Sequence, residues 1–436
     1  MNKQKNIPSL RFPEFEGEWE KKKLGDIGDF IGGGTPPTKN IAYWSGNIPW
    51  VSSSDLIDES IYQIRITRFI SENAIANSAT KLIPEKSILI VSRVGVGKIA
   101  INETKICTSQ DFTSLVPKKD NYIFLAYLIK IKTNRLLEFN QGTSIKGFVK
   151  SDLQMLGIEL PSLPEQEKMA NFFTKIDEKI VGLKKKKSLL EEYKKGVMQQ
   201  LFRQPEPSTE AYENEEDHAA IKSQPSKKSK KSPFRQLRFK RDDGGDFPDW
   251  EVRRLGEIAV DIMYGMNSAS IAFDGINKYL RITDIDDSSR TFLPNPLTSP
   301  EGIIEEKYKL KEGDIVFTRT GASVGKSYLY NKKDGNLLFA GFLIKFSLYN
   351  VDPSFIFYQT LLGSYDKWVV KMSMRSGQPG LNAEEYKDID FTIASLPEQT
   401  KIANFLSALD EKINGVQVQI EKMEIWKKGL LQSMFV

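Results

Sequence analysis

The chain has 436 residues, of which 40% are hydrophobic and 27% are charged, and its formal net charge is +5. These proportions are typical of a globular protein of about three domains, and the weakly basic balance does not by itself indicate a nucleic-acid partner. One cysteine (Cys107) and one histidine (His218) exclude an intrachain disulfide and a Cys/His zinc site.

The single cysteine and the single histidine also speak against thiol or serine catalysis. Cys107 lies between Ile106 and Thr108, which favours a small buried residue over a nucleophile. His218 lies in a polar, charged stretch, where it could not serve a catalytic triad. No run of about 18 apolar residues and no signal-peptide core occur, so we expect a cytoplasmic protein with no membrane span.

The first predicted domain covers residues 1–160. Through residues 28–160, short runs rich in β-branched residues alternate with clusters of Gly, Pro and Asn. This alternation is typical of strands joined by turns. We therefore expect a compact, mainly β domain with a few helices.

A long helix is predicted within residues 161–202. Pro164 lies where a helix tolerates proline, and Glu165 is an acidic residue of the first turn. Apolar residues then recur in steps of four and three, which indicates a heptad seam interrupted by Lys187 and Lys194. The predicted seam residues are Met169, Phe173, Ile176, Ile180, Leu183 and Leu190.

Residues 203–232 are predicted to form a flexible charged linker. The stretch is rich in Pro, Ser, Glu and Lys, and it ends in the basic block 227–231. The basic block could contact DNA phosphates, but a solvated linker is the favoured interpretation.

The remainder of the chain repeats the first part. The stretch 19–27, WEKKKLGDI, recurs as WEVRRLGEI at 250–258, and SLPEQ occurs at both 162–166 and 395–399. Further ordered matches follow at an offset of 233 residues, which indicates an internal duplication. We expect a second domain at 233–394 and a second helix at 395–436, whose seam consists of Ile402, Leu406, Leu409, Ile413, Val416 and Ile420.

The regular seams favour pairing between the two helices over packing of each helix on its own domain. A lone amphipathic helix would drift away from a strict heptad over this length. Three lysines interrupt the seams, Lys187 and Lys194 in the first and Lys427 in the second, and all three are candidates for fixing the register.

Two glycine-rich stretches resemble phosphate-binding loops without matching them. The stretch 321–327, GASVGKS, has one residue too few between its first Gly and the Gly-Lys pair, and a strand is predicted after it. The counterpart at 93–98 is shorter still, and GGGTPP at 32–37 lacks the spacing of a dinucleotide-binding loop. No catalytic residues and no metal site are predicted.

Two divergent halves that share these boundary motifs resemble the specificity subunits of type I restriction–modification enzymes. The motifs that contribute most to this resemblance are LPEQ at 163–166 and 396–399, with the Arg-containing turns that end in Gly-Lys at 97–98 and 325–326. The resemblance covers nearly the whole chain. It implies an α+β fold with two tandem, mainly β target recognition domains, separated by two long helices that form an antiparallel coiled coil with pseudo-twofold symmetry.

The resemblance also implies the partners and the chemistry. A specificity subunit is not an enzyme: it reads a bipartite target in double-stranded DNA and docks two methyltransferase subunits, and restriction and translocase subunits can join. S-adenosylmethionine, ATP and Mg²⁺ are expected on those partners, and no cofactor is expected on this chain.

Polar loops between the predicted strands are the candidates for DNA contact, because Arg, Lys, Asn, Gln, Ser and Thr pair with base edges and phosphates. For each residue, an ordinary turn or surface role is an equally open alternative. The candidates are Thr35, Lys39, Asn40, Ser52, Ser53, Arg93, Lys98, Gln141, Ser144, Lys146, Tyr264, Asn267, Arg281, Arg319, Lys326, Arg375, Gln378 and Asn382.

Two other classes of function stay open. One is a non-catalytic scaffold whose coiled coil joins two ligand-binding β domains, and salt-dependent binding to duplex DNA would separate it from a DNA reader. The other is a self-sufficient nuclease or methyltransferase, for which the catalytic residues are missing.

Overall fold

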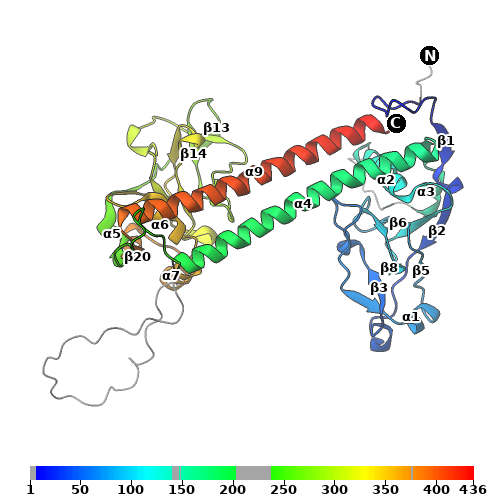
Figure 1. The fold of residues 1–436 in the computed structure, drawn as a ribbon, viewed down its shortest axis with the longest axis horizontal. Helices are drawn as coiled ribbons and strands as arrows, with labels where there is room; N and C mark the ends of the chain where they lie inside the picture. The colour runs from blue at the N-terminus through cyan, green and yellow to red at the C-terminus, as the bar shows by residue number, and fades with distance from the viewer. Residues whose placement is uncertain (1–5, 140–146, 148, 203–236, 375–376) are drawn as a thin grey trace. The chain divides into compact units, whose positions relative to one another are not determined.

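The computed structural model describes residues 6–139, 147, 149–202, 237–374 and 377–436. The chain forms two compact units (Figure 1), of which unit 1 consists of Met1–Lys186 with Val416–Val436, and unit 2 of Lys187–Gly415. The two longest helices, α4 and α9, each contribute to both units. The predicted linker 203–232 lies outside the described residues, and the predicted linear domain boundaries stay predictions.

Unit 1 is built from short strands and a few helices, as the sequence predicts. In chain order, its elements are β1 (Glu20–Lys23), β2 (Gly28–Gly32), β3 (Ile48–Val51), β4 (Arg68–Ile70), α1 (Glu72–Ala76), β5 (Leu82–Ile83), β6 (Ser87–Ile90), β7 (Ile99–Asn102), β8 (Ile106–Thr108), β9 (Thr113–Pro117), α2 (Tyr122–Phe139), α3 (Lys150–Met155), β10 (Gly157–Leu160) and the start of α4 (Leu163–Leu201).

Three sheets organise unit 1. The strand orders are β2-β9-β6-β7, β4-β3-β8-β5 and β1-β10. All pairs are antiparallel except β3 with β8, which is parallel. Pairing of β1 with β10 joins the beginning of the unit to the residues just before α4, so the domain closes where the helix begins.

Unit 2 has a similar, though not identical, order of elements. They are β11 (Glu251–Arg254), α5 (Leu255–Ile258), β12 (Ala259–Tyr264), β13 (Ser270–Ala272), β14 (Lys278–Leu280), β15 (Thr298–Pro300), β16 (Ile315–Thr318), β17 (Ser327–Leu329), β18 (Leu337–Phe339), β19 (Leu343–Leu348), α6 (Pro353–Gln359), α7 (Gly363–Ser373), α8 (Ala383–Lys387), β20 (Asp390–Ile393) and the start of α9 (Leu396–Met434).

The sheets of unit 2 correspond to those of unit 1. The order β12-β19-β16-β17 matches β2-β9-β6-β7, and β11-β20 closes this unit as β1-β10 closes the other. The parallel pair β14 with β18 matches β3 with β8. The internal duplication read from the sequence is therefore a duplication of the fold.

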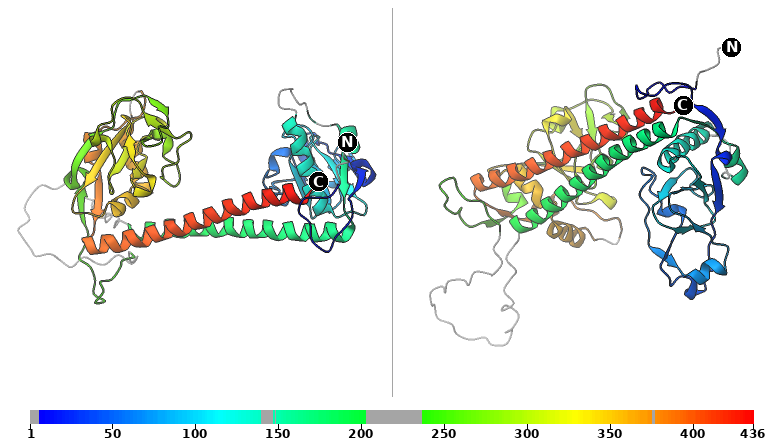
Figure 2. Two further views of the ribbon diagram at one scale, coloured as in Figure 1. Left: turned by 90° about the horizontal axis from the view of Figure 1, so that it is seen from above. Right: turned by 45° about the vertical axis from the view of Figure 1, so that its right-hand side comes forward.

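Within each unit, a segment of α4 lies beside a segment of α9 (Figure 2), and the two run antiparallel. In unit 1, the rings of Phe173 and Phe435 lie 5.8 Å apart, and Lys184 pairs with Glu424 at 2.7 Å. Residues later in α4 thus contact residues earlier in α9, as expected for an antiparallel pair. In unit 2, the later turns of α4 and the early turns of α9 share one apolar core.

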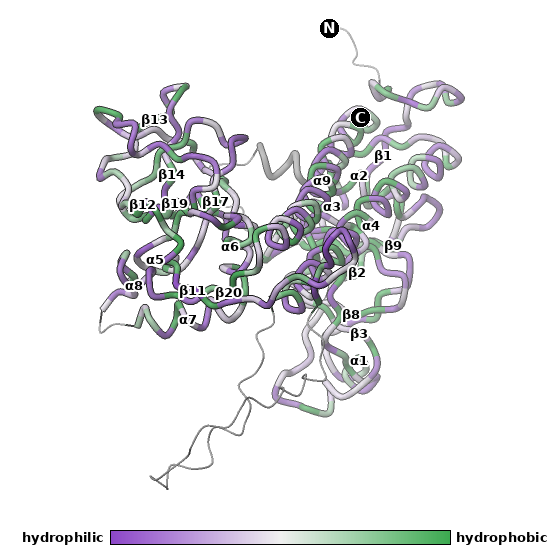
Figure 3. Tube along the Cα trace, turned by 60° about the vertical axis from the view of Figure 1, so that its left-hand side comes forward, coloured by the Kyte–Doolittle hydropathy of each residue, from purple (hydrophilic) through white to green (hydrophobic). Residues whose placement is uncertain are grey.

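The seam residues near the start of each helix serve two contacts at once. Met169 and Phe173 belong to the same core as Trp19 and Phe124 of the domain and Phe435, which directly follows α9. The start of α4 therefore packs on its own domain and contacts the other helical segment at the same time. Both helices alternate hydrophobic and hydrophilic residues along their length (Figure 3).

Burial along the predicted seams is nearly continuous and extends to Val416 and Ile420. Leu190 and Ile413 are only partly buried, whereas the other predicted seam residues are buried. A coiled coil along the full length of both helices stays a prediction.

Among the described helices, none has the length and hydropathy that crossing a membrane requires.

Candidate nucleic-acid interface

In unit 1, the loop that follows β2 lies against the turn that precedes β9. The indole Nε1 of Trp50 donates to the carbonyl oxygen of Gly34 at 3.0 Å, and the Thr35 hydroxyl bonds to the Gln110 side chain. Lys39 and Asn40 farther along this loop are exposed, and the Asn40 side chain accepts from the backbone of the 3-10 turn that follows. Thr35 is thus tied to its neighbours, whereas Lys39 faces solvent.

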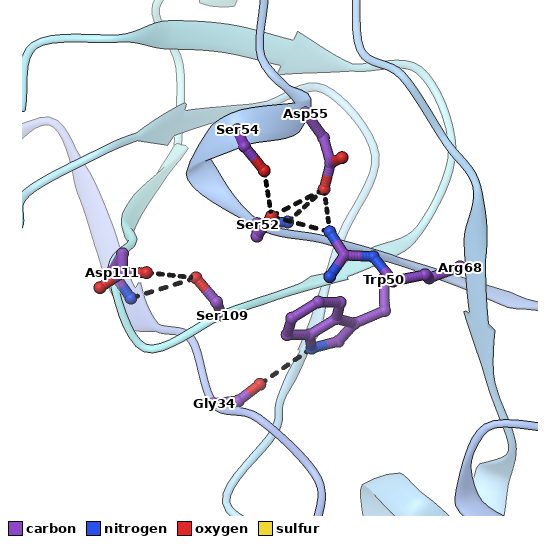
Figure 4. Close-up of polar contacts among 8 residues, drawn as sticks. All are labelled: Gly34, Trp50, Ser52, Ser54, Asp55, Arg68, Ser109 and Asp111. Atoms are coloured by element: carbon purple, nitrogen blue, oxygen red, sulfur yellow. Dashed lines mark hydrogen bonds and ion pairs between the residues drawn. The ribbon is translucent and has the colours of Figure 1, made fainter. Parts of the chain in front are cut away.

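The turn after β3 holds a polar cluster that Figure 4 shows in detail. The carboxylate of Asp55 accepts from the backbone N–H of Ser52 at 2.7 Å and from its hydroxyl at 2.9 Å. The Ser52 and Ser54 hydroxyls lie 2.9 Å apart. Arg68 reaches this cluster from β4: its Nη2 donates to Ser52 Oγ at 2.7 Å and to Asp55, and its guanidinium lies 4.5 Å from the centre of the Trp50 ring.

The glycine-rich turn between β6 and β7 lies against the same region. A Cβ on Gly95 would lie 3.8 Å from the Cβ of Ser53, which is itself buried. Arg93 at the start of the turn is exposed. The predicted loops at 52–54 and 93–98 therefore lie side by side, and Gly147, beside the predicted loop 141–146, approaches Ser92. The loop at 35–40 is joined to the Gln110 side chain through Thr35.

The lysine that ends each glycine-rich turn is held by the protein itself. Lys98 Nζ donates to the carbonyl oxygen of Leu56 at 3.3 Å and lies 3.7 Å from Asp58. In unit 2, Lys326 Nζ donates to the carbonyl oxygen of Ile285 at 3.0 Å and pairs with Asp287. These partners occupy equivalent positions of the repeat.

Lys326 is buried, and its side chain is only 8% exposed. The preceding Gly325 has a φ of +84°, and a Cβ there would lie 2.4 Å from Val369. The Gly-Lys pair therefore has a structural role, because Lys326 fixes the glycine-rich turn to the loop that follows Asp284. A phosphate contact by Lys326, as suggested by the sequence, would require breaking these bonds, so we assign it a structural role.

Three predicted loops of unit 2 meet around Tyr264. The guanidinium of Arg319 lies 5.0 Å from the centre of the Tyr264 ring, and the Tyr264 hydroxyl accepts from the N–H of Ala383 at 3.0 Å. Gln378 is exposed beside Gly321, where its amide would contact an added Cβ at 3.0 Å. Arg319 thus lies over an aromatic ring, as Arg68 does in unit 1, but the ring of Tyr264 is exposed whereas that of Trp50 is buried.

Two other candidates of unit 2 have local structural bonds. Arg281 donates through Nε and Nη2 to both oxygens of Asp284, at 2.8 and 2.7 Å, and to the carbonyl oxygen of Pro296 at 3.0 Å. The Asn382 side chain caps α8 by accepting from the N–H of Glu385 at 2.9 Å. Asn267 is exposed. Gln141, Ser144, Lys146 and Arg375 lie outside the described residues.

Arg68 is not among the predicted site residues, because a single arginine at the start of a short strand carries no motif. The physical role of the LPEQ motif is likewise visible only in the structure. Glu165 is buried and receives two bonds from Arg11, at 2.8 and 2.7 Å. Gln166 accepts from the N–H of Asn121 at 3.0 Å, so the motif joins the start of α4 to the segment before β1 and to the start of α2.

The same contacts recur in unit 2. Glu398 accepts from Arg238 at 3.1 and 2.7 Å and from the indole of Trp250 at 2.9 Å, and Gln399 accepts from the N–H of Asp352 at 2.8 Å. Repetition of the pattern supports a structural role for the motif.

The chemistry of the described residues does not suggest a catalytic centre. Burial raises the pKa of the Cys107 thiol to about 11, so it is protonated near neutral pH. The phosphate-loop-like stretch at 321–327 runs into strand β17, as the sequence predicts, so no helix N-terminus follows it. Within the described ranges, no group of three or more His, Cys, Asp or Glu side chains could hold a metal ion.

Comparison with known proteins gives a consistent result. The sequence model of the family described as type I restriction modification DNA specificity domain matches this chain twice, at residues 16–192 and 248–422. The chain is 28% identical to the type I restriction enzyme MjaIX specificity subunit of Methanocaldococcus jannaschii, with 96% of this chain and 92% of that protein covered. It is 32% identical to the EcoR124I/EcoR124II specificity subunit of Escherichia coli over 38% of this chain and 43% of that protein.

Solved structures share the fold. The crystal structure of the S subunit of a type I restriction-modification system from M. genitalium matches with a TM-score of 0.60 at 15% identity, and 99% of both chains is covered. A chain from a study of complex assembly and conformational transition of the type I R-M system matches with a TM-score of 0.52 at 16% identity, covering 95% of this chain and 96% of that chain. Since the family model matches two segments that make up most of the sequence, this chain belongs to the type I restriction–modification specificity subunits.

Proposed function

We propose that this chain reads a bipartite sequence in double-stranded DNA, with each unit recognising one part of the target. The observation that carries the proposal is the repeated scaffold with unlike side chains at its loops. The arginine that lies over an aromatic ring comes from different elements: in unit 1 it is Arg68 of β4, over Trp50, and in unit 2 it is Arg319 just after β16, over Tyr264. A shared frame with different polar groups is suited to reading two different half-sites, because base edges are distinguished by their donors and acceptors.

The chain acts within a larger complex that supplies the chemistry. As a specificity subunit, it is not itself the enzyme. We propose two methyltransferase subunits as partners, which bind S-adenosylmethionine and methylate adenines, and restriction subunits that use ATP and Mg²⁺. Such a complex would act on cellular DNA, so we place it in the cytoplasm.

We further propose that α4 and α9 set the number of unread base pairs between the two half-sites. Inserting four residues near Leu183 would lengthen α4 by about 6 Å. The half-sites should keep their sequences while the preferred gap between them changes. An unchanged gap together with altered bases would contradict this role.

The direct test is to map methylated adenines in cells that carry the full chain and its methyltransferase partner. A two-part motif is expected. Exchange of residues 1–160 for those of a relative should change one half of the motif and leave the other intact. Changes in both halves at once would contradict the assignment of one half-site to each unit.

A scaffold that joins two ligand-binding β domains is the alternative. Contact with phosphates makes affinity fall linearly with salt on logarithmic axes. Binding of the chain to duplex DNA that does not respond to salt, or no binding at all, would favour the scaffold.

A further inference from the structure

Arg319, which directly follows strand β16, is held by its backbone on both sides. Its N–H donates to the carbonyl oxygen of Phe342 at 3.0 Å, and its carbonyl oxygen accepts from the N–H of Leu381 at 2.8 Å. The guanidinium lies over the ring of Tyr264, 5.0 Å from its centre. The Tyr264 hydroxyl accepts from the N–H of Ala383 at 3.0 Å, so the ring is itself anchored. The backbone of Arg319 and the ring beside its guanidinium are therefore both fixed.

The guanidinium of Arg319 has all of its N–H donors available. Within the described part of the chain, its nitrogens donate no hydrogen bond and form no ion pair. Arg281 of the same unit differs, because its Nε and Nη2 both donate to Asp284. A guanidinium has two edges that each offer a pair of parallel donors, Nε with Nη2 and Nη1 with Nη2, and we call such a pair a fork. Arg319 keeps both forks complete.

Unit 1 has a serine at the backbone position of Arg319. The N–H of Ser92 donates to the carbonyl oxygen of Asp111 at 2.8 Å, as the N–H of Arg319 donates to that of Phe342. In each unit, the N–H of the preceding residue donates to the carbonyl oxygen of the lysine that ends the glycine-rich turn, at 2.9 Å. Ser92 is buried, and Arg93 comes one residue later. The two arginines of the glycine-rich turns are therefore not equivalent in the structure.

Unit 1 also lacks the aromatic ring. Gly32 ends β2 as Tyr264 ends β12, and these two strands have the same place in their sheets. The backbone N–H that follows each of them donates to the neighbouring chain, at 3.2 and 3.0 Å. Unit 1 thus has Gly32 and Ser92 where unit 2 has Tyr264 and Arg319. Because unit 1 forms the same sheet without the pair, the fold itself does not require it.

The side chains around Arg319 suit the edges of bases. Gln378 is exposed beside Gly321, and Phe342 is 60% exposed. Amide side chains pair with the edge of adenine, and apolar side chains contact the methyl group of thymine. Lys326, which ends the same turn, donates to the protein itself. This set of neighbours favours a contact of Arg319 with a base over a contact with a phosphate.

We propose that Arg319 reads a guanine in the half-site recognised by unit 2, by donating two hydrogen bonds from one fork to the O6 and N7 acceptors of the base. This inference rests on the proposed DNA-reading function. A complete fork matches these two acceptors at the major-groove edge, and this pairing is the commonest specific contact with a base. The ring of Tyr264 restricts the guanidinium, so less side-chain entropy is lost on binding. Since unit 1 carries Ser92 at this position, the contact has no counterpart in the other half-site.

The test uses the full chain in complex with its methyltransferase partner. Methylated adenines are mapped for the wild-type complex, and the half-site of unit 2 is the half that stays unchanged when residues 1–160 are exchanged. Binding is then measured on duplexes that carry this motif, with each guanine of that half-site, on either strand, replaced in turn by 7-deazaguanine. This base lacks the N7 acceptor but still pairs with cytosine.

Four proteins are compared: the wild type, Arg319→Met, Arg319→Lys and the control Arg253→Met. Methionine at position 319 still covers Tyr264 but donates nothing, and lysine keeps the charge but lacks the planar fork. Arg253 lies in β11, pairs with Glu251 and is 42% exposed, so its replacement removes the same charge from another element of unit 2. Thermal melts establish that the variants fold.

Arg319→Met should weaken binding to the wild-type site roughly 5- to 100-fold and should lose the preference for guanine at one position. Arg319→Lys should keep the salt slope of the wild type but discriminate less at that position. One 7-deazaguanine should weaken binding by the wild type and have no effect on Arg319→Met. Arg253→Met should keep the full base preference. Since the modified DNA leaves the protein unaltered, this arm holds even where a variant folds poorly.

Four results would overturn the inference. They are a half-site of unit 2 without any G·C pair, no effect of 7-deazaguanine on the wild type, an equal loss of preference in Arg253→Met, and full base preference in Arg319→Met. The last result together with a lower salt slope would identify a phosphate contact. Failure of the proposed function would look different, because the wild-type complex itself would then yield no two-part motif.

Discussion

Lys194 in α4 donates a hydrogen bond to the carboxylate of Asp410 in α9 at 2.6 Å. The phenol of Tyr358 donates to the other oxygen of this carboxylate at 2.8 Å, and Lys194 Nζ lies 4.9 Å from the centre of the Tyr358 ring. Burial, with the nearby Asp410 charge, raises the pKa of Tyr358, so its phenol stays protonated and donates. The lysine that interrupts the seam thus joins the two helices.

The repeat counterpart in unit 1 has the same composition. Lys427 of α9 and Tyr127 donate to the two oxygens of Asp177 in α4, and Lys427 Nζ lies 5.3 Å from the centre of the Tyr127 ring. Each lysine therefore binds the aspartate of the other helix. A shift of either helix by one residue would break the contact, which supports the predicted role of Lys194 and Lys427 in register.

Asp177→Ala should destabilise unit 1 more than Asp410→Ala destabilises unit 2. Asp177 and Lys427 are 11% and 13% exposed, so removal of the carboxylate strands a buried charge at a cost of about 3–5 kcal/mol. Asp410 is 44% exposed, and water can replace it, so about 1 kcal/mol is expected there. Urea unfolding of the full chain would measure both.

The double variant Asp177→Leu with Lys427→Met serves as the control for this comparison. It removes both charges, so it should recover part of the loss. Equal effects of the two single alanine variants would contradict the burial argument.

Arg319 and Lys326 should behave differently although they flank the same turn. Arg319→Met should weaken DNA binding and lower the salt slope by up to about 1, because this arginine lies on an exposed ring and can reach a phosphate or a base. Lys326→Met should leave the salt slope unchanged and lower the melting temperature. The change removes a buried ammonium group and leaves the carbonyl oxygen of Ile285 without its hydrogen-bond donor. A lower slope for Lys326→Met would restore its predicted phosphate contact.

This pair illustrates what the sequence could and could not reveal. The duplication, the mainly β domains and the long helices follow from repeated motifs and from periodicity, because these signals extend over many residues. Whether a lysine such as Lys326 points to solvent or to a carbonyl depends on a loop far away in sequence, and no local pattern records this. Arg68 was missed for the same reason, since its partners come from a different strand and turn.

Phe435→Ala and Phe202→Ala should each destabilise a different unit. The ring of Phe435 lies 5.3 Å from that of Phe124 and 6.3 Å from that of Trp19, all in unit 1, whereas Phe202 contacts Phe355 of unit 2 at 5.3 Å. Both phenylalanines are buried, so each change should cost about 3–5 kcal/mol.

Hydrogen exchange resolved along the sequence would show which unit loses stability in each variant. Faster exchange should appear in β6 and β9 for Phe435→Ala and in β16 and β19 for Phe202→Ala. Loss of protection in the same unit for both variants would contradict the assignment.

Cys107 should resist alkylation in the folded protein. Its pKa of about 11 results mainly from burial, which disfavours the thiolate, the reactive form. The alkylation rate should therefore keep rising between pH 9 and 10, where an ordinary thiol with a pKa of about 8.5 levels off. Iodoacetamide labelling followed by mass spectrometry checks this, with the urea-unfolded chain as control, and a plateau below pH 9 would contradict it.

The place of Met434 and Phe435 in the core of unit 1 has a consequence for biosynthesis. Both residues emerge from the ribosome after every residue of unit 2, whereas Trp19, their neighbour in the same core, emerges at the start. Domains generally fold in the order in which they are made. In this chain, the domain that is translated first has to wait with an incomplete core, and it can be completed only after the second domain has left the ribosome.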